Sequence, residues 1–95
     1  MFVVSLVYKV PLVEIDRLRD GHIEWLRGCY ADGIFVMSGP KRPRTGGIIL
    51  AKCSRAELDA RLAQDPFATE GAADYEVIEF AALNVAAELE SFRET

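Results

Sequence analysis

The sequence offers few side chains that could bind a metal ion. It contains one histidine, His22, and two cysteines, Cys29 and Cys53. The cysteines form no C-x-x-C pair, and one histidine cannot complete a zinc site with them. We therefore expect no metal and no cofactor, and we expect both thiols to be buried in the interior of a protein from a reducing compartment.

Long apolar runs are also missing. The longest cover residues 2–4, 34–37 and 48–51, far short of the ~20 residues that a membrane-spanning helix needs. No basic leader precedes the first of these runs, so we expect no signal peptide. The pattern predicts a cytoplasmic protein without a membrane partner.

The chain lacks an excess of positive charge. It has 11 Lys and Arg against 15 Asp and Glu, which gives a net charge of −4. Proteins that bind nucleic acids usually present a basic face. Only Lys41, Arg42 and Arg44 form a basic cluster here, so we expect no nucleic-acid partner.

The sequence does contain enough apolar material for one small domain. Hydrophobic residues make up 51% of its 95 positions, which is typical of a globular chain. Runs of β-branched and aromatic residues predict strands at residues 2–8, 34–38, 47–53 and 75–80. A helix is predicted between Pro11 and Gly33. Gly21 lowers the stability of that helix by about 1 kcal/mol relative to Ala, and a short turn with a helix starting near residue 20 is the alternative.

The second predicted helix opens with the capping box Ser54–Glu57 and ends before Pro66. The resulting order, β-α-β-β-α-β, is that of the ferredoxin-like α+β fold with a four-stranded antiparallel sheet. Several predicted strands carry bulky apolar residues on both faces, and no spare helix remains to cover the second face. A second copy of the chain is the simplest cover, so we predict a homodimer.

His22 lies in the apolar stripe of the first predicted helix, between Leu18 and Trp25. A ring that faces inward needs a hydrogen-bond partner, and an imidazole can exchange protons near neutral pH. Two interpretations remain open. His22 is either a core histidine bonded to a backbone carbonyl or an acid–base residue of a functional site.

Asp65 is the second unusual residue, because it continues the buried stripe of Leu58 and Leu62. A carboxylate there could orient or charge His22. It could equally cap the turn that begins at Pro66, since Asp before Pro favours a helix start. The two roles are compatible, with one carboxylate oxygen for each.

Two further features are ambiguous. Ser38 ends a predicted strand just before Gly39 and Pro40, where its hydroxyl could contact a ligand, act as a nucleophile or simply finish the strand. The basic run Lys41–Arg44 could bind an anionic substrate or form a solvated hairpin tip. The aromatic rings of Trp25 and Tyr75 suit the core or a dimer contact, although either could form the wall of a ligand site.

An ordered set of short motifs resembles the YCII-related family over residues 1 to about 82. The matching pieces are His22 with Trp25-Leu26, Gly33, Ser38-Gly39-Pro40, Arg44-Thr45-Gly46-Gly47, Asp65-Pro66-Phe67 and residues 74–80. Gly21 stands just before His22, at a position where relatives often carry a small residue such as Ala. We accordingly expect a domain at residues 1–82 and a tail helix within residues 83–95, which the resemblance does not cover.

The resemblance implies a dimeric α+β barrel similar to muconolactone isomerases, with an active site around a His–Asp pair that corresponds to His22 and Asp65. Five residues are expected to contact the substrate: Ser38, Gly39, Pro40, Trp25 and Phe67. A few relatives are enzymes of aromatic-compound breakdown, including a dehydrochlorinase of a chlorinated hydroxyquinol.

Two functions follow. One is a cofactor-free enzyme that uses the pair for isomerisation or elimination on a small cyclic compound, such as a lactone or a hydroxyquinol. The other is a non-catalytic dimer that binds or senses a small molecule.

Overall fold

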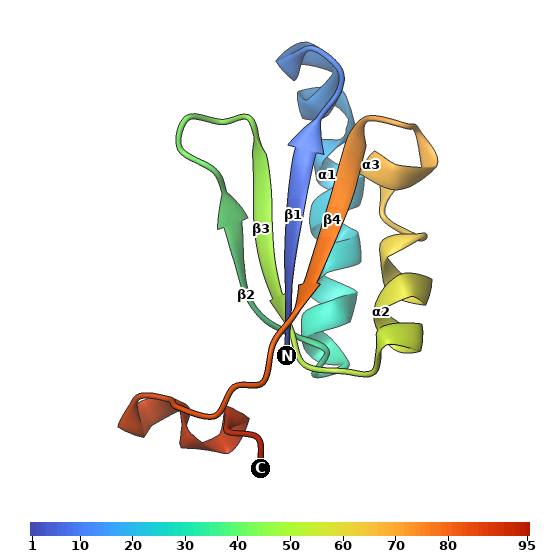
Figure 1. The fold of residues 1–95 in the computed structure, drawn as a ribbon. Helices are drawn as coiled ribbons and strands as arrows, with labels where there is room; N and C mark the ends of the chain where they lie inside the picture. The colour runs from blue at the N-terminus through green and yellow to red at the C-terminus, as the bar shows by residue number, and fades with distance from the viewer.

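The computed structural model describes residues 1–95 and has the predicted order of elements (Figure 1). The elements are β1 (Phe2–Tyr8), α1 (Leu12–Ala31), β2 (Phe35–Pro40), β3 (Gly46–Ala51), α2 (Arg55–Leu62), α3 (Pro66–Thr69), β4 (Ala73–Glu79) and the 3-10 helix η1 (Ala87–Phe92). The four strands form one sheet in the order β2-β3-β1-β4, and every neighbouring pair is antiparallel. The three α-helices lie on one face of the sheet (Figure 1). The ferredoxin-like α+β fold is therefore confirmed.

The two faces of the sheet differ because side chains alternate along each strand. In β1, Phe2, Val4 and Leu6 are buried under the helices. The register places Ile49 of β3 and Val77 of β4 beside Val4, on the same face. These residues form the sheet side of the hydrophobic core.

Helix α1 is continuous, so the predicted helix between Pro11 and Gly33 is confirmed and the alternative of a short turn with a helix starting near residue 20 is wrong. A β-carbon at residue 21 would lie 3.3 Å from Cγ of Pro66, because α3 packs against α1 at this point. The small residue lets α3 approach α1 closely, and this approach bears directly on the site because α3 begins just after Asp65. The helix ends at Gly33, which has a φ of 73° that favours glycine.

Gly46 brings β3 close to β1. A β-carbon at this position would lie 1.7 Å from the carbonyl oxygen of Leu6, so no other residue fits without moving the backbone. The chain can therefore pair Leu6 with Gly47 and Ser5 with Ile48 immediately after the β2–β3 loop.

The second helical segment divides at Asp65. The predicted capping box opens α2, with the Ser54 hydroxyl accepting from the backbone N–H of Glu57. Asp65 then caps α3, since its carboxylate accepts from the backbone N–H of Phe67 and Pro66 is the first helical residue. The capping role that the sequence suggested for Asp65 is present.

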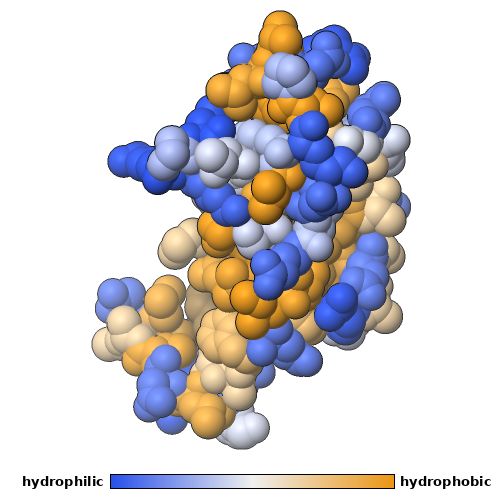
Figure 2. Space-filling model, turned by 45° about the horizontal axis from the view of Figure 1, so that its top comes forward, coloured by the Kyte–Doolittle hydropathy of each residue, from blue (hydrophilic) through white to orange (hydrophobic).

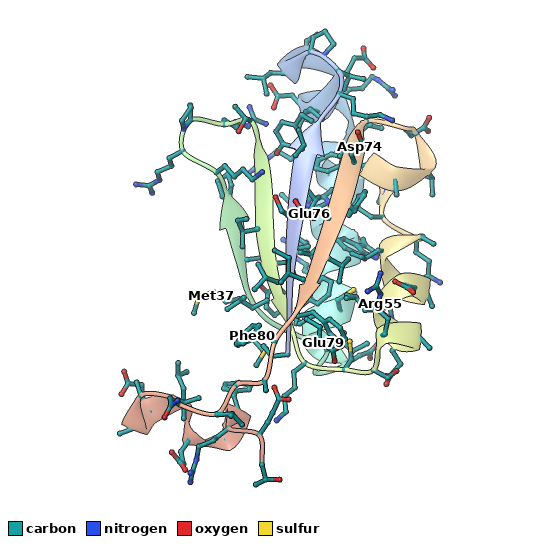
Figure 3. All side chains as sticks on the ribbon, viewed as in Figure 1. Met37, Arg55, Asp74, Glu76, Glu79 and Phe80 are labelled. Carbon is teal, nitrogen blue, oxygen red and sulfur yellow. The ribbon has the colours of Figure 1, made fainter.

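The other face of the sheet has no helix over it. Large apolar side chains are exposed there, including Val7, Met37, Ile48 and Ile78. Hydrophobic side chains are gathered in the middle of the view in Figure 2, which looks obliquely onto this face. Met37 projects outward from the sheet edge, and Phe80 follows β4 close to the start of the tail (Figure 3). We refer to this surface as the free face.

The tail after β4 extends away from the sheet (Figure 1). The predicted tail helix is present as the 3-10 helix η1, which is held to the body by Lys52. The Lys52 ammonium donates to the carbonyl of Ser91 at 3.1 Å and lies 5.0 Å from the ring centroid of Phe92. No helix in the structure has the length and hydropathy needed to cross a membrane.

Candidate functional site

His22 and Asp65 lie next to each other, although 43 positions separate them in the chain. Nδ1 of His22, on α1, is 2.8 Å from Oδ1 of Asp65, just before α3. The His22 side chain is 15% exposed and that of Asp65 is fully buried. The partner of the imidazole is thus a carboxylate and not the backbone carbonyl that was the alternative.

The Asp65 carboxylate has a partner for each oxygen. Oδ1 accepts from the backbone N–H of Phe67 at 3.1 Å and also faces His22, while Oδ2 accepts from the hydroxyl of Tyr75 at 2.5 Å. A buried carboxylate is costly without such donors. The set fixes the orientation of the carboxylate. Oδ1 alone combines helix capping with contact to the imidazole, so the expectation of one oxygen for each role was wrong.

Tyr75, which the sequence suggested for the core, a dimer contact or the wall of a ligand site, is instead a hydrogen-bond partner of the Asp65 carboxylate. The pairing of Leu6 with Tyr75 puts this residue on the helix-covered face of β4, directed at Asp65. Burial raises the pKa of Tyr75, and its hydrogen bond to Asp65 raises it further. The phenol therefore stays protonated and remains a donor.

The contact with Asp65 also sets the tautomer of His22. Because the carboxylate only accepts, the proton of a neutral imidazole belongs on Nδ1, which leaves a lone pair on Nε2. Nε2 has no hydrogen-bond partner within the chain, and no buried side-chain nitrogen or oxygen atom lacks one. Nε2 is therefore accessible, as a general base must be.

Aromatic rings hold the imidazole in place. The Phe67 ring stacks on it with a centroid distance of 4.0 Å and an interplanar angle of 10°. Trp25 lies 5.5 Å away on the same helix. The indole N–H of Trp25 donates to the carbonyl of Arg61 at 2.9 Å, so Trp25 joins α1 to α2.

A cavity of about 460 Å³ opens beside His22, between α1 and the sheet. This volume suits a small organic molecule. Its apolar lining includes Ile15, Ile23, Leu26, Ile49 and Phe67, and its polar lining includes Tyr8, Asp16, Arg19, His22, Ser38 and Arg44. Gly39 and Pro40 also line it. Of the seven expected site residues, Asp65 and Trp25 do not reach the wall, because Asp65 lies behind His22 and Trp25 faces α2.

Ser38 reaches this cavity from β2. Its Oγ is 2.6 Å from the hydroxyl of Tyr30 on α1. A tyrosine hydroxyl is a poor base for activating serine. The contact holds the Ser38 hydroxyl in place at the wall, which suits hydrogen bonding to a ligand better than nucleophilic attack.

The cysteines take no part in this site. Both are free, and burial raises the pKa of each thiol. The structure contains no group of three or more His, Cys, Asp or Glu side chains arranged to hold a metal ion.

The comparisons with known proteins agree on the fold. The 5-chloro-2-hydroxyhydroquinone dehydrochlorinase from Burkholderia phenoliruptrix AC1100, solved in complex with 2,5-dihydroxybenzoquinone, is similar with a TM-score of 0.66 and 20% sequence identity. The match covers 84% of this chain and 93% of that one. No curated protein matches the sequence. The model of the YCII-related domain matches residues 1–81, nearly the whole sheet-and-helix body, and the chain belongs to the YCII-related family.

Proposed function

We propose that this protein is an enzyme that needs no cofactor and uses His22 for acid–base chemistry on a small cyclic organic compound, such as a lactone or a hydroxyquinol. The observation that carries the proposal is the geometry of the imidazole. Nδ1 is held 2.8 Å from a buried carboxylate, while the accessible Nε2 belongs to a residue that lines the cavity. This arrangement supports a general base of fixed orientation.

The proposed reaction begins when Nε2 removes a proton from the ring, next to a carbonyl or at a hydroxyl group. The electron pair of the broken bond moves into the ring and generates an enolate or a phenolate. In an isomerisation, the imidazolium returns the proton to another carbon. In an elimination from a hydroxyquinol, the imidazolium first protonates the carbon that carries the halide. Nε2 then removes the proton of a second hydroxyl group, the electron pair of that bond expels the halide as the ring becomes a quinone, and the imidazolium releases its proton to solvent. A base positioned in this way typically accelerates a reaction by roughly 10²–10⁴-fold.

Each neighbour of His22 has a role in this proposal. Asp65 fixes the tautomer and stabilises the imidazolium that forms, and Tyr75 holds Asp65. The face of the Phe67 ring lies against the imidazole, where it also favours a positive charge. Ser38, Gly39 and Pro40 would contact the substrate from the sheet side, and Trp25 would support the site from behind.

The printed activity of the similar structure is compatible with this chemistry. That protein is a dehydrochlorinase of a chlorinated hydroxyquinol, seen with a dihydroxyquinone. Elimination of a halide from a ring of this size needs a base and a cavity, both of which are available here. The likeness supports a small ring compound with oxygen substituents as the class of substrate.

We also propose that the protein is a homodimer joined through the free face. Exposed Val7, Met37, Ile48 and Ile78 are apolar, and a sheet face of this kind is stabilised when it is covered. A dimer interface of common size buries about 800 Å² of each partner. A second copy seated on the free face would cover these side chains.

The direct test is turnover of a panel of lactones and chlorinated hydroxyquinols. We expect at least one compound to be isomerised or to release chloride, and we expect His22→Gln to lower kcat/KM by about 100-fold or more. Glutamine keeps a donor for Asp65, so the variant should fold. The matched control is Glu24→Gln, an exposed position on the same helix.

Three outcomes decide the matter. Turnover that is lost in His22→Gln and kept in the control supports the proposal. Tight binding without turnover of any compound would favour the non-catalytic sensing dimer instead. Equal turnover in His22→Gln and the wild type would remove His22 from the chemistry.

A further inference from the structure

The cavity beside His22 carries charged groups that the proton transfer itself does not require. Arg19 and Arg44 are positive and Asp16 is negative, and all three residues line the wall. The whole chain has a net charge of −4, whereas these three residues together carry a net positive charge. Charge of this sign at a cavity raises the local concentration of an anionic ligand.

Arg44 and Asp16 neutralise each other across the cavity. Arg44 comes from the β2–β3 loop, and its Nη2 donates to Oδ1 of Asp16 on α1 at 2.5 Å. This contact raises the pKa of Arg44. The pair links the loop to the helix, and it occupies the carboxylate that stands one helical turn before Arg19.

Arg19 is left without a carboxylate partner. Asp16 lies three residues earlier, where an ion pair along the helix would be possible, but Arg44 has taken it. No carboxylate lies within 4 Å of the Arg19 guanidinium, whereas Arg17 on the same helix is paired with Glu14. Arg19 is thus an unpaired cation at the wall of the cavity.

The position of Arg19 relative to His22 allows one ligand to contact both residues. The two residues are three apart on α1, which places their β-carbons about 5–6 Å from each other on one face of the helix. A single ring spans such a distance. A ligand whose carbon faces Nε2 of His22 can therefore present an oxygen substituent to the guanidinium.

We infer that the cavity selects single-ring ligands that carry an anionic oxygen, as a phenolate, an enolate or a carboxylate, and that Arg19 binds this oxygen. A planar guanidinium suits such an oxygen because it offers paired donors. The inference rests on the proposed function in that both use the same cavity. The inference adds a statement about the charge of the substrate, and a binding measurement without turnover can test that statement.

The test is calorimetric binding of two quinones of the same skeleton. 2,5-Dihydroxybenzoquinone has acidic hydroxyl groups and is an anion at neutral pH, whereas 2,5-dimethoxybenzoquinone stays neutral. We expect the wild type to bind the dihydroxy compound at least about 10-fold more tightly, as loss of one charged hydrogen bond implies. Arg19→Gln should remove this preference and leave the affinity for the dimethoxy compound unchanged.

Two further variants separate a charge effect from a structural one. Asp16→Asn removes the competing negative charge and frees Arg44, so it should strengthen binding of the dihydroxy compound by a few-fold. Arg17→Gln, on the solvent side of the same helix, should change neither affinity. A weakening in Asp16→Asn would contradict the inference.

The inference is overturned if the wild type binds both quinones equally or binds neither. It is also overturned if Arg19→Gln weakens both to the same extent. These results are distinct from failure of the proposed function. The wild type could prefer the anionic quinone, keep this preference in His22→Gln and turn over no compound. That result would contradict the proposed enzyme and support the anion site.

Discussion

The hydroxyl of Tyr75 donates to Oδ2 of Asp65, the carboxylate oxygen that His22 does not contact. The imidazole, the carboxylate and the phenol thus form a chain from the cavity into the core. It brings together α1, the start of α3 and β4. Each hydrogen bond restricts the orientation of the next side chain. A substitution of Tyr75 should therefore affect His22 although the two residues are not in direct contact.

Removal of the phenol hydroxyl tests this chain. We expect Tyr75→Phe to lower the free energy of unfolding by about 1–3 kcal/mol, because a buried carboxylate loses a donor. Turnover should fall as well, through kcat more than through KM, since Tyr75 positions Asp65 and does not line the cavity. Denaturant unfolding and steady-state kinetics measure the two effects. Tyr30→Phe, which removes an exposed hydroxyl, is the control for stability.

Alkaline pH should reveal the same bond. The pKa of Tyr75 is raised in the folded state, so the phenol stays neutral there while it ionises in the unfolded chain near its ordinary value of about 10. The stabilisation is complete below pH ~10 and is lost as the pH rises further, by at most about 1.4 kcal/mol per pH unit. Unfolding measured from pH 9 to 11 should show a shallower loss in Tyr75→Phe. Identical slopes in both proteins would contradict the raised pKa.

Asp65→Asn should weaken the imidazole as a base with little change of shape. The amide oxygen can replace Oδ1, where it accepts from the backbone N–H of Phe67 and from Nδ1–H of His22, while the NH₂ group faces the Tyr75 hydroxyl, which can accept. The tautomer of His22 is then kept, but the negative charge that stabilises the imidazolium is lost. We expect kcat/KM to fall by about 10–100-fold, as loss of a charged hydrogen bond implies, and nitrogen NMR of the single histidine should show the same tautomer as in the wild type. Asp59→Asn, on the exposed side of α2, should leave both unchanged.

Two glycines should respond to alanine in opposite directions. Gly46→Ala puts a methyl group into the backbone of Leu6 and should cost several kcal/mol or prevent folding, as overpacking of a fixed backbone does. Gly28→Ala, in α1, meets no atom within 4 Å and should stabilise the protein by about 1 kcal/mol. Thermal and denaturant unfolding compare them. Equal effects would mean that β3 does not require the close approach to β1.

The dimer can be tested on the free face at the edge strand β4. Ile78 is 50% exposed, and Ile78→Lys would place a charge against its counterpart or neighbours in a second copy. We expect a dimeric mass for the wild type at micromolar concentration and a monomeric mass for the variant by sedimentation. Val13→Lys is the control, since Val13 is an exposed apolar residue on α1 away from this face. A monomeric wild type would refute the dimer.

Much of the fold could be predicted because its signals are local. The β-branched runs, the capping box at Ser54 and the Asp65-Pro66 helix start each depend on neighbouring residues. Strand ends were less certain. The register of β2 shifts between Phe35 and Met37, and no periodic pattern announces such a bulge. The role of Gly21 was misjudged because the cost to the helix is local, whereas the benefit comes from Pro66, 45 positions later by the numbering of the two residues.

The site was partly predictable for the same reason. His22 and Asp65 stood out as polar residues in apolar stripes, and the structure brings them together. The contact of Tyr75 with Asp65 was not predicted, because a tyrosine in a strand is ordinary and its hydrogen-bond partner is known only once β4 lies beside β1. Trp25 was expected at the cavity, but its indole N–H is bonded to Arg61 in the next helix. Within the basic run at residues 41–44, Arg44 is distinct because its guanidinium is bonded to Asp16.

Trp25 provides an intrinsic fluorescence probe close to His22. It is the single tryptophan of the chain, its ring centre is 5.5 Å from that of His22, and its indole N–H is tied to the backbone of α2. Tryptophan emission from the unmodified protein, excited at wavelengths that tyrosine does not absorb, therefore arises from one known place. A change in its intensity or wavelength would follow events at the imidazole, with no label attached to a chain of only 95 residues.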